Sequence, residues 1–294
     1  MAALVALTVS MASFALIYMA GDPAIAIAGE NATPDVIAEI RRQYGYDRPV
    51  AVQYLDWLWN ALHGDFGISP FYKLPVWELI STRLHVTLTL GMLAICFALL
   101  VGVPTGVLAA MRPNSLLDRA ALFVAVVGQA IPSFWFGLLL IVLFAVTLGW
   151  LPASGVADWR GYILPTIVLG YYATPAIMRL TRAGMIEVLS SDYIRTARAK
   201  GVAPRRILFK HALRNAVIPV VSLAAVQMGF MLGGSIVTES VFALHGAGYL
   251  AWQSISRNDL PTMQALILMF SMFYIFFTFM ADVLNAWLDP RLRS

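Results

Sequence analysis

The sequence predicts an all-α polytopic membrane protein with six transmembrane helices. Of the 294 residues, 60% are hydrophobic and only 12% are charged, whereas ordinary soluble domains have about 25% charged residues. The mean hydropathy is +0.76. This composition excludes a soluble globular enzyme. The 16 Phe, 11 Tyr and 8 Trp residues also exclude a disordered or low-complexity chain.

A helix needs about 20 apolar residues to cross a hydrocarbon core of about 30 Å. Six stretches without Asp, Glu, Lys or Arg meet this need: 1–20, 84–111, 120–150, 161–178, 215–238 and 260–281. The first could be a secretory signal peptide, since Ala26-Ile27-Ala28 resembles a cleavage site, but it has no basic n-region. We therefore favour a retained helix. The third has room for one tilted helix and a re-entrant or interfacial segment.

The distribution of basic residues predicts that both termini are cytoplasmic. With this orientation, 13 of the 20 Lys and Arg residues fall on the inner side, as expected because cytoplasmic loops collect them. The chain then divides into a first transmembrane helix (1–20), an extracytoplasmic segment of short amphipathic helices (21–83) and a five-helix core (84–294) with an internal loop at about 183–214. The net charge of +4 reflects this topology, so we expect no nucleic-acid partner.

The chain lacks the motifs of several enzyme classes. The phosphate-binding loop requires Gly-Lys followed by Ser or Thr, but Lys73, Lys200 and Lys210 precede Leu, Gly and His. No His begins an H-E-x-x-H zinc motif, no Ser/His/Asp set stands out, and the single Cys96 cannot form an internal disulfide. We predict no catalytic, cofactor-binding or metal-binding residues, which argues against an integral-membrane enzyme.

Polar residues inside the apolar stretches are candidates for lining a solute pathway. Gln129 and Gln227 could line a pathway, but hydrogen bonding between helices explains either residue equally well. Glu239 and Asp282 lie near the ends of their stretches, where a structural or solvated carboxylate is more frequent than a proton relay. The alternative function, an ion-coupled secondary transporter, would need one of these two carboxylates.

Two pairs of glycines predict close packing of helices. Gly102 and Gly106 form one G-x-x-x-G pair, and Gly229 and Gly233 form another. Prolines inside the stretches interrupt the backbone hydrogen bonds as well. These features suit a bundle that changes shape, and they disfavour a purely structural scaffold.

The internal loop is predicted to hold a short helix. Asp192 can cap this helix, and Gly201 with Pro204 then breaks it. A second helix begins near Pro204 and continues towards the fifth span. The first helix would therefore project from the membrane as a separate short element.

The composition of this loop suggests a protein partner. Between Arg195 and Arg214 there are seven basic residues and no acidic one. Anionic lipid headgroups alone would explain the charge. They would not explain why small residues recur at Ala197, Ala199 and Gly201, where the backbone is open to close approach. We therefore predict that a partner docks here.

The segment Arg195-Thr-Ala-Arg-Ala-Lys-Gly201 resembles the E-A-A-x-x-x-G loop of bacterial ABC importer permeases, in the form used by the oligopeptide/dipeptide/nickel branch. Arg195 stands where the general family has Glu, and Leu213-Arg214 stand where it has Leu-Pro. The basic segment that usually precedes the first span is absent, which leaves the boundary of the first helix open. Further matches follow in order at residues 21–24, 44–49, 53–54, 64–69, 259–261 and 288–291.

The resemblance implies a type I importer permease in the bacterial inner (plasma) membrane, with no cofactor of its own. It implies a second homologous permease, two ABC ATPase subunits that bind ATP and Mg, and an extracytoplasmic solute-binding protein as partners, besides membrane lipid. The family branch carries di- and oligopeptides, and relatives carry nickel chelates, glutathione or some sugars. The ATPases would receive a coupling loop formed by Arg195, Ala197, Arg198, Ala199, Lys200, Gly201 and Val202.

Overall fold

The computed structural model describes residues 2–19, 22–29 and 32–288. Within these residues the elements are helices joined by turns and loops, and the only β pairing is one isolated bridge between Ile68 and Pro75. Three helices are long and apolar enough to cross a membrane. They are α5 (Val76–Met111), α13 (Ile218–Val241) and α15 (Leu260–Leu288). The second predicted span thus starts earlier than residue 84, because the helix begins directly after Pro75 and includes a charged first turn with Glu78.

Two further apolar segments are sharply bent. α6 (Leu116–Ala130) and α7 (Ser133–Leu140), which continues as a π-helical turn over Ile141–Thr147, meet at 102°. A 3-10 turn (Trp159–Tyr162) with α8 (Ile163–Gly170) meets α9 (Thr174–Leu189) at 59°. Pro132 and Pro175 lie at these breaks, where each removes a backbone donor. Each pair counted as one span gives up to five spans in the described residues.

The remaining N-terminal helices are α1 (Ala2–Met19), α2 (Pro23–Ala28), α3 (Pro34–Gln43) and α4 (Val50–Leu62). α1 is apolar but shorter than the three long helices, so the six-span count stays a prediction. The tyrosine of α4 packs on α1: the Tyr54 ring lies 5.4 Å from the Phe14 ring, and its hydroxyl lies 2.8 Å from Ser10 Oγ. α4 therefore packs on α1, and α2 packs on α3.

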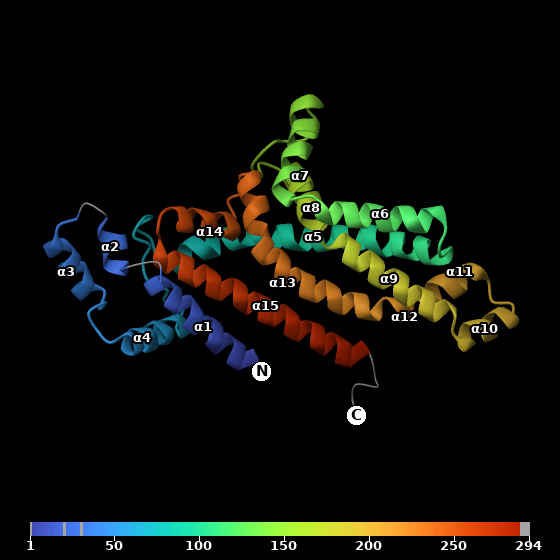
Figure 1. Ribbon diagram of the computed structural model, residues 1–294, viewed down its shortest axis with the longest axis horizontal. Coiled ribbons are helices and arrows are strands. Elements are labelled where there is room, and N and C mark those ends of the chain that lie inside the picture. Colours follow the sequence, from blue (N-terminus) through green and yellow to red (C-terminus); the bar gives the residue numbers. More distant parts are fainter. Residues whose placement is uncertain (1, 20–21, 30–31, 289–294) are drawn as a thin grey trace.

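The helices form an elongated bundle (Figure 1). α5, α9, α13 and α15 run along its length, and α1 lies beside α15. α2 to α4 lie at one end, called here the α4 end. The opposite end, called the α10 end, carries α10 (Asp192–Ala199), α11 (Pro204–Arg206), a π-helical turn (Ile207–Leu213) and α12 (Arg214–Ala216). The last connecting helix, α14 (Ala247–Ser256), packs against α13, α5 and α15.

Glycines decide how closely these helices approach one another. A Cβ atom on Gly102 would lie 2.8 Å from Ile177 Cγ2 of α9, and one on Gly106 would lie 2.6 Å from the Met178 carbonyl oxygen. The close approach predicted at this pair is therefore confirmed. The second pair contributes one contact only, because Gly229 abuts Tyr274 of α15 whereas Gly233 faces open space.

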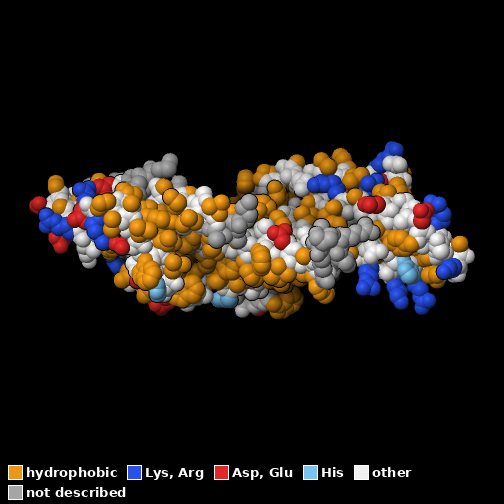
Figure 2. All heavy atoms as spheres, turned by 90° about the horizontal axis from the view of Figure 1, so that it is seen from below, with side chains coloured by type: hydrophobic (Ala, Val, Ile, Leu, Met, Phe, Trp, Pro, Cys, Tyr) orange, Lys and Arg blue, Asp and Glu red, His pale blue; other side chains and the backbone are white. Residues whose placement is uncertain are grey.

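The surface separates into an apolar middle and charged ends. Figure 2 shows hydrophobic side chains over the middle of the bundle and a gathering of Lys and Arg at the α10 end. Many large apolar side chains of the long helices are exposed, among them Leu100, Phe230 and Phe279. Exposure of this extent in water would favour aggregation, but in lipid it is the expected outer surface of a helix bundle.

Candidate functional site

The α10 end holds the segment whose sequence predicted a docking helix. α9 ends at Leu189, and only Ser190 and Ser191 separate it from α10. The residue at the N-cap is Ser191, and Asp192 is the first residue of the helix. The predicted cap is therefore wrong by one position. Ser191 has the extended backbone conformation of an N-cap. The Asp192 carboxylate lies 3.2 Å from the exposed Arg195 guanidinium, and its charge still favours the helix N-terminus.

The C-terminal end of α10 is encoded by Gly201. Its φ of +74° lies in the left-handed region, which glycine adopts without a steric penalty. The Gly201 amide donates to the Arg198 carbonyl at 3.0 Å, and the Val202 amide donates to the Ala197 carbonyl at 3.2 Å. This pair of bonds is the Schellman motif, which satisfies the free carbonyls of a helix end. The break predicted at Gly201 is confirmed, and α11 begins at Pro204.

Few side chains attach α10 to the bundle. Ile194 is fully buried, and the Tyr193 hydroxyl donates to the His211 carbonyl at 3.2 Å and accepts from Asn215 Nδ2 at 2.8 Å. The remaining surface of the helix is open. Of the predicted coupling residues, Ala197 and Val202 are half-buried, and the rest are exposed: Arg195, Arg198, Ala199, Lys200 and Gly201. A Cβ atom on Gly201 would meet nothing within 4 Å.

This open helix therefore presents a basic, small-residue surface beyond the apolar middle of the molecule. α10 contacts the π-helical turn Ile207–Leu213. A residue of that turn, Ala212, belongs to an apolar cluster with Val107 of α5, Met185 of α9 and Ala216 of α12. A force on α10 would thus reach α9 along the chain and α5 and α12 through this cluster.

A cavity of about 880 Å³ lies in the middle of the bundle, between α1, α7, α8, α13 and α15. Gln227 lines it, and so does Thr238, whose buried hydroxyl has no hydrogen-bond partner. No charged side chain is among the described residues of its lining. The other polar residues that line it are Ser133, Tyr172, Ser271 and Tyr274.

The structure separates the two predicted glutamines. Gln129 is not among the residues of this cavity, and its Oε1 accepts a hydrogen bond from Arg179 Nη1 at 3.3 Å. The two carboxylates also differ. Glu239 is fully buried, whereas Asp282 is exposed on α15.

Glu239 forms a buried polar junction of three helices. Thr87 Oγ1 of α5 donates to Glu239 Oε1 at 2.7 Å, and the Tyr249 amide of α14 donates to Glu239 Oε2 at 2.8 Å. The same Thr87 hydroxyl accepts from the Ala247 amide at 2.8 Å. These bonds compensate the burial of the carboxylate. They match the structural role that the sequence favoured for Glu239.

Two of the sequence motifs meet at the start of α15. Ser69 Oγ donates to Asp259 Oδ2 at 2.5 Å, and Thr262 Oγ1 donates to the same oxygen at 2.9 Å. The motif at 64–69 and the motif at 259–261 thus form one buried contact.

Sequence reasoning missed an ion pair between Asp118 of α6 and Arg182 of α9, where Arg182 Nε donates to Asp118 Oδ1 at 2.6 Å. The helix cap has a local signal in Ser115-x-x-Asp118, but no local signal marks Arg182 as the partner, since α9 also carries Arg179 and Glu187.

Comparison with known proteins assigns the family. A sequence profile described as binding-protein-dependent transport system inner membrane component matches residues 102–294. A second profile, described as the N-terminal part of the same membrane component, matches residues 1–91. The chain belongs to this family. The permease is accordingly a multi-pass inner-membrane protein and the membrane subunit of an ABC importer, and such subunits are not themselves enzymes.

Relatives of known function share the full length of the permease. It is 43% identical over 286 residues to the glutathione transport system permease protein GsiC of Escherichia coli K12, covering 97% of this chain and 94% of the relative. It is 44% identical over 273 residues to GsiC of Salmonella typhi, covering 93% of this chain and 89% of the relative.

Solved structures share the fold. A structure of the MetNI methionine ABC transporter in an inward-facing conformation aligns with a TM-score of 0.60 at 20% identity, covering 72% of the permease and 97% of that chain. An amino acid ABC transporter aligns with a TM-score of 0.51 at 18% identity, covering 73% and 94%. At this identity the likeness concerns the fold alone.

Proposed function

We propose that the permease carries a small peptide, with glutathione as the first candidate, into the cytoplasm at the expense of ATP hydrolysed by separate subunits. Its full-length similarity to glutathione permeases supports this class of solute. The lining of the central cavity also fits it. Amide and hydroxyl groups of the lining, such as those of Gln227, Ser133 and Ser271, can exchange hydrogen bonds with a peptide backbone.

The open surface of α10 is the observation that supports coupling of this permease to ATP hydrolysis by its partners. In the proposed orientation, both termini and α10 lie in the cytoplasm, and two ATPase subunits bind α10 of this chain and of a second permease. A solute-binding protein delivers the solute at the α4 end. ATP-driven closure of the ATPases moves α10, and the bundle switches between inward- and outward-facing states by rigid-body movement.

The role of Gly201 provides the test. Gly201→Arg adds a long cationic side chain where the permease itself offers no contact, and it strains the left-handed turn that ends α10. The variant should still insert, since this turn lies outside the apolar spans, but fail to dock its ATPases. We expect ATP-dependent uptake of glutathione into reconstituted vesicles to fall to background. Gly201→Asn is the matched control, since Asn tolerates the left-handed backbone and stays small. It should retain most of the uptake.

The alternative function gives the opposite result. An ion-coupled secondary transporter would take up solute along an ion gradient without ATPase subunits, and Gly201→Arg would leave its uptake unchanged. Uptake by the permease alone, driven by a proton or sodium gradient, would overturn the proposal. Competition by dipeptides, a nickel chelate and glutathione in the same vesicles identifies the solute class.

A further inference from the structure

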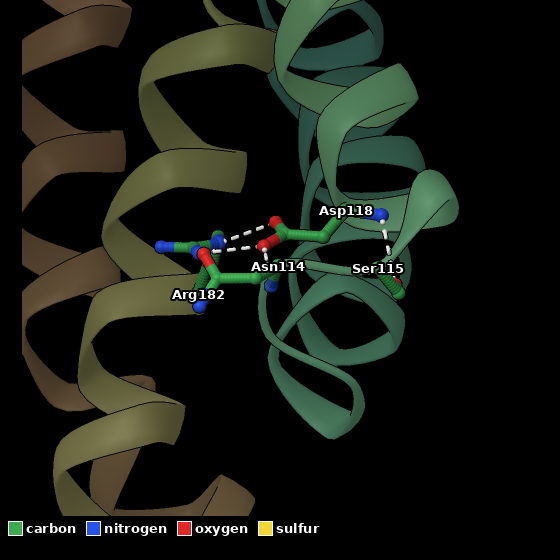
Figure 3. A network of polar contacts seen from close by, with 4 residues as sticks. All are labelled: Asn114, Ser115, Asp118 and Arg182. Atoms are coloured by element: carbon green, nitrogen blue, oxygen red, sulfur yellow. Dashed lines mark hydrogen bonds and ion pairs between the residues drawn. The ribbon is translucent and has the colours of Figure 1, made fainter.

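An ion pair at the α10 end joins α6 to α9 (Figure 3). Arg182 Nε donates to Asp118 Oδ1 at 2.6 Å, and Arg182 Nη2 donates to Asp118 Oδ2 at 2.7 Å. Two parallel bonds between planar groups fix orientation as well as distance. The Asp118 side chain is 2% exposed and the Arg182 side chain 22% exposed, so water competes little with this pair.

The turn between α5 and α6 holds the carboxylate in place. Ser115 caps α6 by accepting from the Asp118 amide at 3.3 Å, and the Asn114 amide donates to Asp118 Oδ2 at 2.8 Å. Asn114 has a φ of +64°, a conformation that asparagine adopts more readily than most residues. Asp118 is therefore fixed to its own turn, and Arg182 connects that turn to α9, as Figure 3 shows.

The pair stands beside the closest contact of α5 with α9. A Cβ atom on Gly106 would lie 2.6 Å from the Met178 carbonyl oxygen and 2.8 Å from Thr181 Cβ. Arg182 itself precedes the end of α9 at Leu189 by about 10 Å of helix at 1.5 Å per residue. α10 follows after two residues. The pair thus lies on the path from α10 into the bundle.

We infer that Asp118 and Arg182 transmit the movement of α10 to α5 and α6. This inference rests on the proposed function, in which partner ATPases move α10. Apolar contacts between helices are not directional, so they fix the relative position of two helices less strictly than a bidentate ion pair does. The bidentate ion pair resists sliding, because a shift along the helix axis breaks both of its bonds. α9 and the α5–α6 turn therefore move as one body, and Asp118 and Arg182 act as positioning residues.

The experiment measures solute transported per ATP hydrolysed by the complete reconstituted complex, with glutathione-loaded binding protein. Asp118→Asn removes the charge at nearly constant size, and Arg182→Lys keeps the charge but loses the second bond. Both variants should insert and bind ATPases, and both should hydrolyse ATP. We expect transport per ATP to fall about fivefold or more, the lower end of typical coupling between sites.

A matched control is Asp282, an exposed carboxylate of α15 to which the proposed mechanism assigns no role. Asp282→Asn removes a charge in the same way as Asp118→Asn and should leave transport per ATP unchanged. Normal transport per ATP in both Asp118→Asn and Arg182→Lys would overturn the inference. A loss of uptake that only follows the amount of inserted protein, with an unchanged ratio, would overturn it too. Absence of ATP-dependent uptake in the unmodified complex would instead refute the proposed function.

Discussion

The two partners of the Asp118–Arg182 pair occupy unequal environments, so their removal should have unequal effects on stability. Arg182→Ala leaves a carboxylate that is 2% exposed without its cation, and an unpaired buried charge costs about 3–5 kcal/mol. Asp118→Ala leaves a guanidinium that already reaches solvent, so the loss should be smaller. Thermal unfolding of the two purified variants in detergent measures the difference. Equal melting temperatures would contradict this account of the pair.

Glu239 offers a second test at the level of single residues. Glu239→Gln keeps the size and the acceptor for Thr87 but sets its NH2 group against the Tyr249 amide, so we expect a modest loss of stability and near-normal uptake per inserted protein. Glu239→Ala leaves the Thr87 hydroxyl and the Tyr249 amide without their acceptor, at about 1–3 kcal/mol for each buried group. This variant should accumulate poorly. An ion-coupled carrier that used Glu239 would lose its uptake in Glu239→Gln, which makes the uptake assay decisive between the two functions.

At the scale of elements, the contact of α5 with α9 depends on a glycine that no larger residue can replace. Gly106→Ala would force the new Cβ against the backbone of α9, so the helices must separate. The matched variant Gly233→Ala lies in α13 with nothing within 4 Å, where alanine should stabilise the helix by about 0.8–1 kcal/mol. We expect Gly106→Ala to lower the melting temperature and Gly233→Ala to leave it unchanged or raise it slightly. Opposite ranking of the two would refute the packing described here.

The elements that the sequence predicted best are those encoded by local backbone chemistry. Gly201 and Pro204 define the end of α10 and the start of α11 because one tolerates a left-handed φ and the other fixes its own φ. The pairing of Asp118 with Arg182 could not be predicted, since each residue could equally well be solvated. The same holds for Ser69 and Asp259, which meet only after the chain has folded. At Gly233 the sequence predicted a helix contact that the structure does not have. A G-x-x-x-G motif does not reveal whether another helix lies opposite both of its glycines.

At the scale of the whole molecule, the apolar stretches predicted the bundle, but the orientation stays a prediction. It can be tested with Ala199→Cys in α10 and Asn60→Cys in α4, each in a Cys96→Ser background. Both positions are exposed. A membrane-impermeant maleimide should label Asn60→Cys in spheroplasts, and it should label Ala199→Cys only after permeabilisation. The reverse pattern would place α10 outside the cell and contradict its proposed role.

The overall arrangement also explains why the solute resists prediction. The cavity is lined by residues of α1, α7, α8, α13 and α15. Its chemistry therefore depends on how segments distant in the sequence come together. Gln227 lines this cavity and Gln129 does not, although both are glutamines in stretches without charged residues. The bend of 102° after α6 separates Gln129 from the following segment. Pro132 in the sequence indicates that the chain bends here, but it does not indicate the direction of the bend.

The central claim is that energy enters the permease through α10. The most direct measurement is the ATPase rate of the complex purified with its ATPase subunits in lipid, with and without glutathione-loaded binding protein. We predict that loaded binding protein raises the rate of the unmodified complex and that Gly201→Arg abolishes this stimulation while Gly201→Asn preserves it. Stimulation that persists unchanged in Gly201→Arg would contradict the claim.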